Sequence, residues 1–300
     1  MSQSSKGGEQ DKKSRGADPI RLVRIAQRDF EAAKVLFEKN LYANAVYTLH
    51  QSIEKAAKAI LIKLGLIRTE EELRKRIGHE VSRNVLKLLE GVTTSLILEM
   101  LELFLQLSKD EAKSKCSSLI LDSLNLMYSF YKECKLKRRQ VLEAIEGFSK
   151  IVLMDVDKDI EEKANECVVN YFSCAYALSG LVCDEVFTAY ANVAKCLGVD
   201  VEVLRKYLTE KSMELYLWDT LGFLTLFHAP FESAVSKLRY SIESIDENKF
   251  IVWWSKQIVN QIESTKMLKC IEEYIEKRIA EPKCKEILDV TLNVFILKLT

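Results

Sequence analysis

The sequence predicts an all-α protein, and three observations support that fold class. The chain of 300 residues contains only 3 Pro and 10 Gly, whereas a β-rich chain of this length needs many more turn residues. Apolar residues recur at steps of three and four along most segments, which is the helical period. Hydrophobic residues make up 48% of the chain, which is enough for a packed core and too many for a disordered protein.

The first two predicted helices form an antiparallel hairpin. Asp18 and Pro19 are the residue types of a helix N-cap and of a first helical position, so a helix is expected over about 19–39. Asn40 can end this helix in the left-handed conformation, and the second helix is expected over about 41–64, where Gly65 ends it. The connection between them is so short that the two helices must pack side by side.

Each helix of this hairpin carries an apolar face. The face of the first helix is formed by Leu22, Ala26, Phe30, Ala33 and Phe37. The face of the second helix is formed by Val46, Leu49, Ile53, Ala57, Ile60 and Leu64. These two faces are the predicted start of the core.

A short helix should follow the hairpin. Thr69 with Glu72 three residues later forms a capping box, so a helix is expected to about Arg76. Gly78 ends it, and the next helix begins near His79. Further helices are expected over about 93–107, 110–132, 136–154, 159–197, 201–227 and 231–242, with a last helix over about 247–280. Pro230 is expected to end the helix that begins at 201, and Gly198 the one before it.

Cysteine usage and hydropathy indicate a cytoplasmic protein. The eight cysteines include no Cys-x-x-Cys pair and no Cys/His set with zinc spacing, so buried free thiols are expected. The first 17 residues lack the apolar stretch of a secretory signal, and no uncharged run reaches the ~20 residues of a membrane span. We therefore expect a soluble protein with reduced thiols, no membrane contact, no metal and no cofactor.

The charge balance limits how the chain can bind nucleic acid. The 44 Lys and Arg residues equal the 44 Asp and Glu residues, which argues against histone-like binding but leaves room for a local basic patch. One such patch lies at a predicted helix junction and consists of Lys132, Lys135, Lys137, Arg138 and Arg139. These side chains either hold phosphates, with nearby tyrosines for stacking, or form an ordinary solvated helix end.

Two stretches resemble the signature hairpin of HEPN domains. Residues 41–47 read LYANAVY and residues 50–61 read HQSIEKAAKAIL, after a first helix that contains DFEAAKVLFEKN. A polar loop then leads to His79, which begins the next helix in that family's pattern. Later in the chain, Arg239-Tyr240 is similar to an Arg-Tyr pair that precedes the family's last long helix.

The resemblance implies an antiparallel helical bundle of HEPN type with additional helices. On that basis the chain divides into a flexible tail (1–17), HEPN-like helices (18–92), a helical insertion or second helical unit (93–198), C-terminal helices that complete the bundle (199–284) and a C-terminal tail (285–300). HEPN domains pair two-fold, so a homodimer is expected. Some members bind RNA or nucleotides, and others are partners of minimal nucleotidyltransferases.

Many HEPN proteins are metal-independent endoribonucleases with an Arg-x(4–6)-His motif. Arg74 and His79 are the one pair in this sequence with that spacing. In the role that the resemblance implies, Arg74 holds the scissile phosphate and His79 is the general acid or base. These two residues are the predicted catalytic pair.

A second candidate site lies on the predicted second helix. His50, Glu54 and Lys58 are spaced by four residues and therefore share one side of that helix. By analogy with the family, this column and Arg239-Tyr240 would line a groove for RNA or a nucleotide. The alternative is a simple Glu54–Lys58 ion pair beside a histidine whose ring is satisfied locally.

The predicted function is binding of RNA or a nucleotide. If the protein is an enzyme, the predicted activity is that of a ribonuclease in a toxin–antitoxin or defence system. The alternative is an all-helical interaction scaffold without catalysis, which the neutral net charge and the three histidines also fit.

Overall fold

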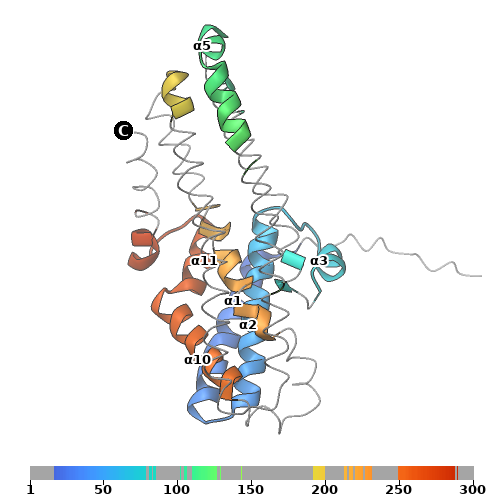
Figure 1. The fold of residues 1–300 in the computed structure, drawn as a ribbon. Coiled ribbons are helices and arrows are strands. Elements are labelled where there is room, and N and C mark those ends of the chain that lie inside the picture. The colour runs from blue at the N-terminus through green and yellow to red at the C-terminus, as the bar shows by residue number, and fades with distance from the viewer. Residues whose placement is uncertain are drawn as a thin grey trace, which may run out of the picture.

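The computed structural model describes residues 17–78, 81–82, 84–85, 102, 105–106, 110–126, 129, 143, 192–199, 213–214, 216–218, 220–225, 227–231, 249–287 and 289. Every element assigned in these ranges is a helix, and none of these residues belongs to a strand. The predicted all-α fold class is therefore confirmed (Figure 1).

Helices α1 (Pro19–Glu38) and α2 (Tyr42–Lys63) form the predicted hairpin. The side chain of Asp18 caps α1 by accepting two backbone N–H groups, at 3.0 and 3.2 Å. Asn40 adopts the left-handed conformation with φ 58°, and Gly65 does so after α2 with φ 73°. The local signals that predicted these helix ends are therefore confirmed.

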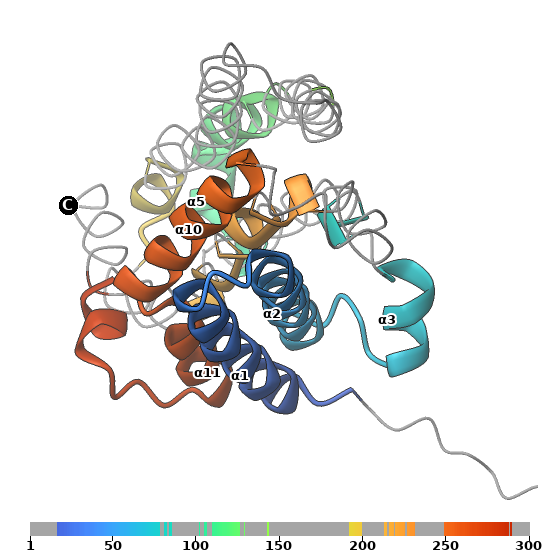
Figure 2. The ribbon, with the colours of Figure 1, turned by 90° about the horizontal axis from the view of Figure 1, so that it is seen from below.

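Helix α2 is the centre of the bundle. The side of α1 that faces it buries Val23, Ala26, Phe30 and Ala33. On α2 the predicted face is buried except for the half-buried Leu64, and burial extends to polar positions outside that face. This wider burial has a simple cause, because α2 contacts α1, α10 and α11 and so has neighbours on several sides (Figure 2).

Helices α10 (Lys249–Ser264) and α11 (Met267–Glu276) cover the hairpin from the C-terminal part of the chain. The single helix predicted over 247–280 is therefore wrong, because the chain turns between them. Lys266 is left-handed there, with φ 53°, and the hydroxyl of Thr265 donates to a carbonyl of α10. A left-handed lysine breaks the helical path, since that conformation cannot continue an α-helix.

A polar seam joins α1 to α11. Arg24 donates to Glu272 and to Glu276, each at 2.9 Å, and Gln27 donates to Glu272 at 3.1 Å. Burial raises the pKa of Glu272, but the bonds from Arg24 and Gln27, together with Lys269, outweigh it and hold that pKa below its ordinary value. Glu272 is therefore a charged group that the fold stabilises.

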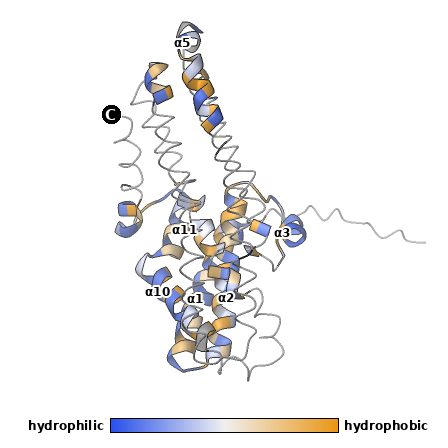
Figure 3. Cartoon of the chain, viewed as in Figure 1, coloured by the Kyte–Doolittle hydropathy of each residue, from blue (hydrophilic) through white to orange (hydrophobic). Residues whose placement is uncertain are grey.

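The short helix α3 (Glu70–Arg76) lies outside the core. Thr69 accepts the backbone N–H of Glu72 at 3.1 Å, as a capping residue does, while the Glu72 carboxylate accepts the N–H of Arg68. Gly78, with φ 57°, ends the helix as predicted. No residue of α3 is buried, and Figure 3 shows it as a hydrophilic helix on the side of the hairpin.

Two disulfides correct the expectation of free thiols. Cys116, next to α5 (Asp110–Lys115), is bonded to Cys196, and Cys270 of α11 is bonded to Cys284. The first disulfide joins two segments that Figure 1 shows together, away from the α1–α2 hairpin. The other four cysteines, Cys134, Cys167, Cys174 and Cys183, lie outside the described residues.

Two further helix ends can be compared with the sequence. Gly198, with φ 64°, ends a helical segment at 192–196, as predicted. Residues 227–231 are helical and include Pro230, so the predicted helix end at that proline is wrong. Across the part of the chain that the structure describes, no helix is long and apolar enough to cross a bilayer.

Candidate functional site

The predicted site residues fall into two groups. Those outside the described residues are His79, Lys135, Lys137, Arg138, Arg139, Arg239 and Tyr240. Arg74 on α3 and the column His50, Glu54 and Lys58 on α2 are described. The structure places these two candidates in opposite environments, since Arg74 is exposed and the α2 column faces the core.

Arg74 differs from its two basic neighbours on α3. Lys75 pairs with Glu71 at 2.6 Å, and Arg76 pairs with Glu72 at 2.7 Å. Within the described residues Arg74 makes no such ion pair, and it lies one turn before Gly78, the residue that precedes His79 in the sequence. An exposed guanidinium of this kind can receive a phosphate without first giving up a carboxylate.

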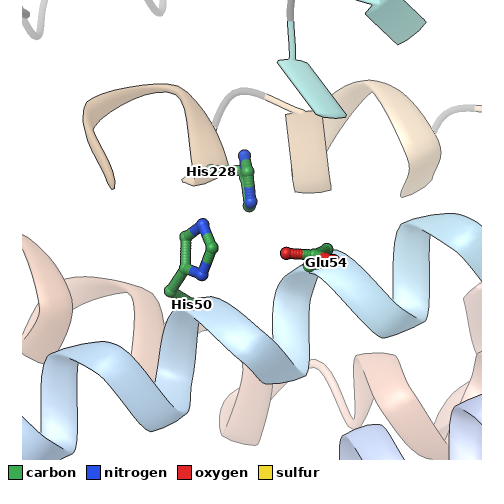
Figure 4. Close-up of side chains that lie close together, drawn as sticks. All are labelled: His50, Glu54 and His228. Atoms are coloured by element: carbon green, nitrogen blue, oxygen red, sulfur yellow. The ribbon is translucent and has the colours of Figure 1, made fainter. Parts of the chain in front are cut away.

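A second group of polar side chains lies in the protein interior. It consists of His50, Glu54 and His228, and we call it the His–Glu cluster. Figure 4 shows the three side chains converging, two from α2 and one from the helical residues 227–231. One potential ligand atom from each residue lies within 4.8 Å of the other two. The exposed fractions of the residues are only 1%, 4% and 0%, so the cluster is shut off from solvent.

The position of the cluster follows from helix geometry. His50 and Glu54 are one turn apart and point to the same side of α2, toward residues 227–231. The His50 ring lies over the ring of His228, with centroids 4.3 Å apart, and meets Phe231 edge-on at 6.1 Å. The side of α2 that carries His50 and Glu54 therefore packs against residues 227–231.

Neighbouring side chains orient His228. Ser82 donates its hydroxyl proton to the carbonyl of Thr225 at 2.8 Å. Its oxygen can then accept a hydrogen bond from His228 Nδ1, which lies 3.2 Å away. When Nδ1 is the donor of a neutral ring, Nε2 has the lone pair that a metal ligand or a hydrogen-bond acceptor needs.

The two α2 members of the cluster also have polar neighbours. The amide nitrogen of Gln51 lies 3.3 Å from His50 Nδ1. Lys55 donates a hydrogen bond to the amide oxygen of the same side chain. Lys58 donates to Glu54 at 2.5 Å, so the predicted Glu54–Lys58 pair is present in the structure. A buried carboxylate requires such a partner, because an isolated charge in the core is costly.

Sequence reasoning did not connect His228 with the other two residues. The sequence predicted that His50 and Glu54, four residues apart, share one side of the second helix, but it assigned no role to His228. That i, i+4 pair on one face was the available signal. The third member comes from a distant segment, and only the tertiary structure brings it there.

A comparison with protein families matches the HEPN domain to residues 21–158. The matched region contains α2, α3 and α5 and all of α1 except its first two residues. This finding agrees with the resemblance carried by the α1–α2 hairpin in the sequence.

A comparison with curated proteins gives one similar relative, "Putative toxin MJ1304" of Methanocaldococcus jannaschii. The two sequences are 41% identical over 65 residues, which is 22% of this chain and 40% of the relative. The chain therefore spans less than half the length of this relative. The comparison with solved structures finds no match.

Proposed function

Because residues 21–158 belong to the HEPN domain family, we propose that this chain is an RNA-cleaving toxin. It binds RNA as a homodimer and cuts it without a metal ion. The name of the relative from Methanocaldococcus jannaschii supports a toxin role. The neutral net charge of the chain fits a protein that contacts RNA at a local site rather than over its whole surface.

The observation that carries the proposal is the environment of Arg74. Its neighbours Lys75 and Arg76 form ion pairs with glutamates of α3. The Arg74 guanidinium is exposed, and no carboxylate among the described residues forms an ion pair with it. It also belongs to the Arg-x4-His pattern with His79. A ribonuclease needs a cation at the scissile phosphate and an imidazole near it.

In the proposed reaction, His79 removes the proton of a ribose 2′-hydroxyl. The 2′ oxygen attacks the adjacent phosphorus, the bond from phosphorus to the 5′ oxygen breaks, and the leaving oxygen takes a proton from an imidazolium. A second His79, supplied by the dimer, serves as that acid. The products are a 2′,3′-cyclic phosphate and a 5′-hydroxyl end, and Arg74 stabilises the charge that develops on the phosphate.

The test is incubation of the purified full chain with a labelled structured RNA in the presence of EDTA. We expect cleavage by the wild type, and loss of at least about a hundredfold in rate for His79→Ala and for Arg74→Ala. Lys75→Ala is the matched control, since it removes a cation from the same helix that is already paired, and it should retain most of the rate.

Equal activity of the Arg74→Ala and Lys75→Ala variants would contradict the role given to Arg74. Intact RNA with a folded wild-type dimer would overturn the nuclease proposal and favour the scaffold alternative. The oligomeric state is measured by light scattering on the same samples, so that a missing dimer is recognised as the cause of a missing activity.

A further inference from the structure

We infer that the His–Glu cluster is a binding site for a divalent transition-metal ion, with Zn²⁺ as the best fit. The ion would hold α2 against residues 227–231 inside the bundle. This site is separate from Arg74, which is exposed on α3 while the cluster is buried. The inference therefore does not depend on the proposed function.

The donor set is the first argument. Two imidazole nitrogens and one carboxylate oxygen suit zinc and its neighbours, whereas Mg²⁺ and Ca²⁺ prefer all-oxygen ligands. Zinc ligands lie about 2.0–2.2 Å from the ion. The three atoms lie within 4.8 Å of one another, so a closing movement of roughly 1 Å brings them to zinc distance.

The second argument is the orientation of His228. Metal-binding histidines usually donate their other ring N–H to a fixed acceptor, which sets the tautomer and the ring direction. The Ser82 hydroxyl, itself anchored to Thr225, is that acceptor for His228 Nδ1. This contact orients the ring so that Nε2 is the nitrogen that can face a metal ion.

The third argument concerns Glu54. A carboxylate has two oxygens, so Glu54 can present one to the ion while Lys58 holds the other. Hydrogen bonds to a ligating carboxylate are the usual support for a metal site. The described residues offer three ligands, which leaves one position of tetrahedral zinc for water or another group.

The burial of the cluster decides what the ion would do. A site with residues exposed by 4% or less does not reach an RNA backbone, so the role is structural. An ion that binds the folded state alone stabilises it, because binding lowers the free energy of that state. Zinc should therefore raise the melting temperature of the chain.

The experiment uses the full chain, stripped with a chelator and desalted. Isothermal titration and elemental analysis should give one zinc per chain, and zinc should raise the melting temperature by about 5 °C or more, unlike Mg²⁺. His50→Gln and His228→Gln keep a polar side chain of similar size. Both should weaken zinc binding at least tenfold while circular dichroism stays unchanged.

His79→Ala is the matched control, since it removes the one histidine outside the cluster, and its zinc affinity should equal that of the wild type. Cobalt substitution separates the cluster from adventitious thiol sites, because nitrogen and oxygen ligands give d–d bands without a thiolate charge-transfer band. Unchanged zinc affinity in both glutamine variants, or a thiolate band, would overturn the inference. So would a wild type that binds zinc no better than Mg²⁺.

The zinc experiment and the RNA assay can fail independently. The RNA assay is run with EDTA at a temperature where the metal-free chain remains folded. Its readout is cleavage, whereas the zinc experiment reads stoichiometry, melting temperature and the cobalt spectrum.

Discussion

The imidazole rings of His50 and His228 lie over each other, with centroids 4.3 Å apart and planes inclined by 31°. They belong to α2 and to a helical segment that the chain reaches far later. The same segment also contacts α10, since Trp254 donates its indole N–H to the Phe227 carbonyl at 3.4 Å. Residues 227–231 are thus fixed between two helices of the bundle, which keeps His228 in place.

Replacing Lys58 with Met should weaken zinc binding by about tenfold, because the ammonium group that supports the ligating carboxylate of Glu54 is lost. Titration of the stripped variant with zinc measures the change. Lys63→Met is the control, since Lys63 lies on the same helix but donates to the Ile275 carbonyl, outside the cluster. Unchanged or stronger zinc binding in Lys58→Met would instead mean that Lys58 does not support the ligating carboxylate.

Replacing Glu272 with Gln should lower stability at neutral pH, and this difference should shrink in acid. Because the fold lowers the pKa of Glu272, its charged form stabilises the protein above the unfolded value of about 4.5. The stabilisation is lost as the pH falls through the still lower pKa of the folded state. Urea unfolding of both proteins between pH 7 and pH 3 measures the effect.

The control for this pH dependence is Glu38→Gln, at the exposed end of α1. That substitution should leave the unfolding curves nearly unchanged at every pH. A constant difference between wild type and Glu272→Gln from pH 7 to pH 3 would exclude the charge of Glu272 as its source.

Replacing Cys270 and Cys284 together with Ala should lower the free energy of unfolding by about 2–4 kcal/mol, the usual effect of removing a disulfide that closes a short loop. The two cysteines are separated by 14 positions. Chemical denaturation without reductant measures the loss. Peptide mapping of the wild type after alkylation checks the premise, since an alkylated Cys270 would show that the bond is absent.

Sequence reasoning was most successful where the determinants are local. Asp18, Thr69 and Gly78 cap or end helices through contacts with residues a few positions away. A hydrogen bond to a backbone N–H two or three residues along depends on little else, so the residue type predicts it. The same is true of the left-handed ends at Asn40 and Gly65.

The prediction was weaker where distant segments meet. The pairing of cysteines cannot be deduced from their positions in the sequence, and both disulfides were missed for that reason. His228 was separated from His50 and Glu54 because only tertiary packing brings it to α2. Lys266 breaks the predicted last helix in a conformation that lysine rarely adopts, and its residue type gave no warning.

The contact of α1 with α11 has a consequence for synthesis on the ribosome. The apolar side chains that complete the core of the hairpin include Leu268, Ile271 and Ile275, near the end of the chain. At about 5–20 residues per second, the α1–α2 hairpin is made more than ten seconds before α11 emerges. Through that interval the nascent chain exposes an unfinished core, and a chaperone that shields α1 and α2 would raise the yield of folded protein.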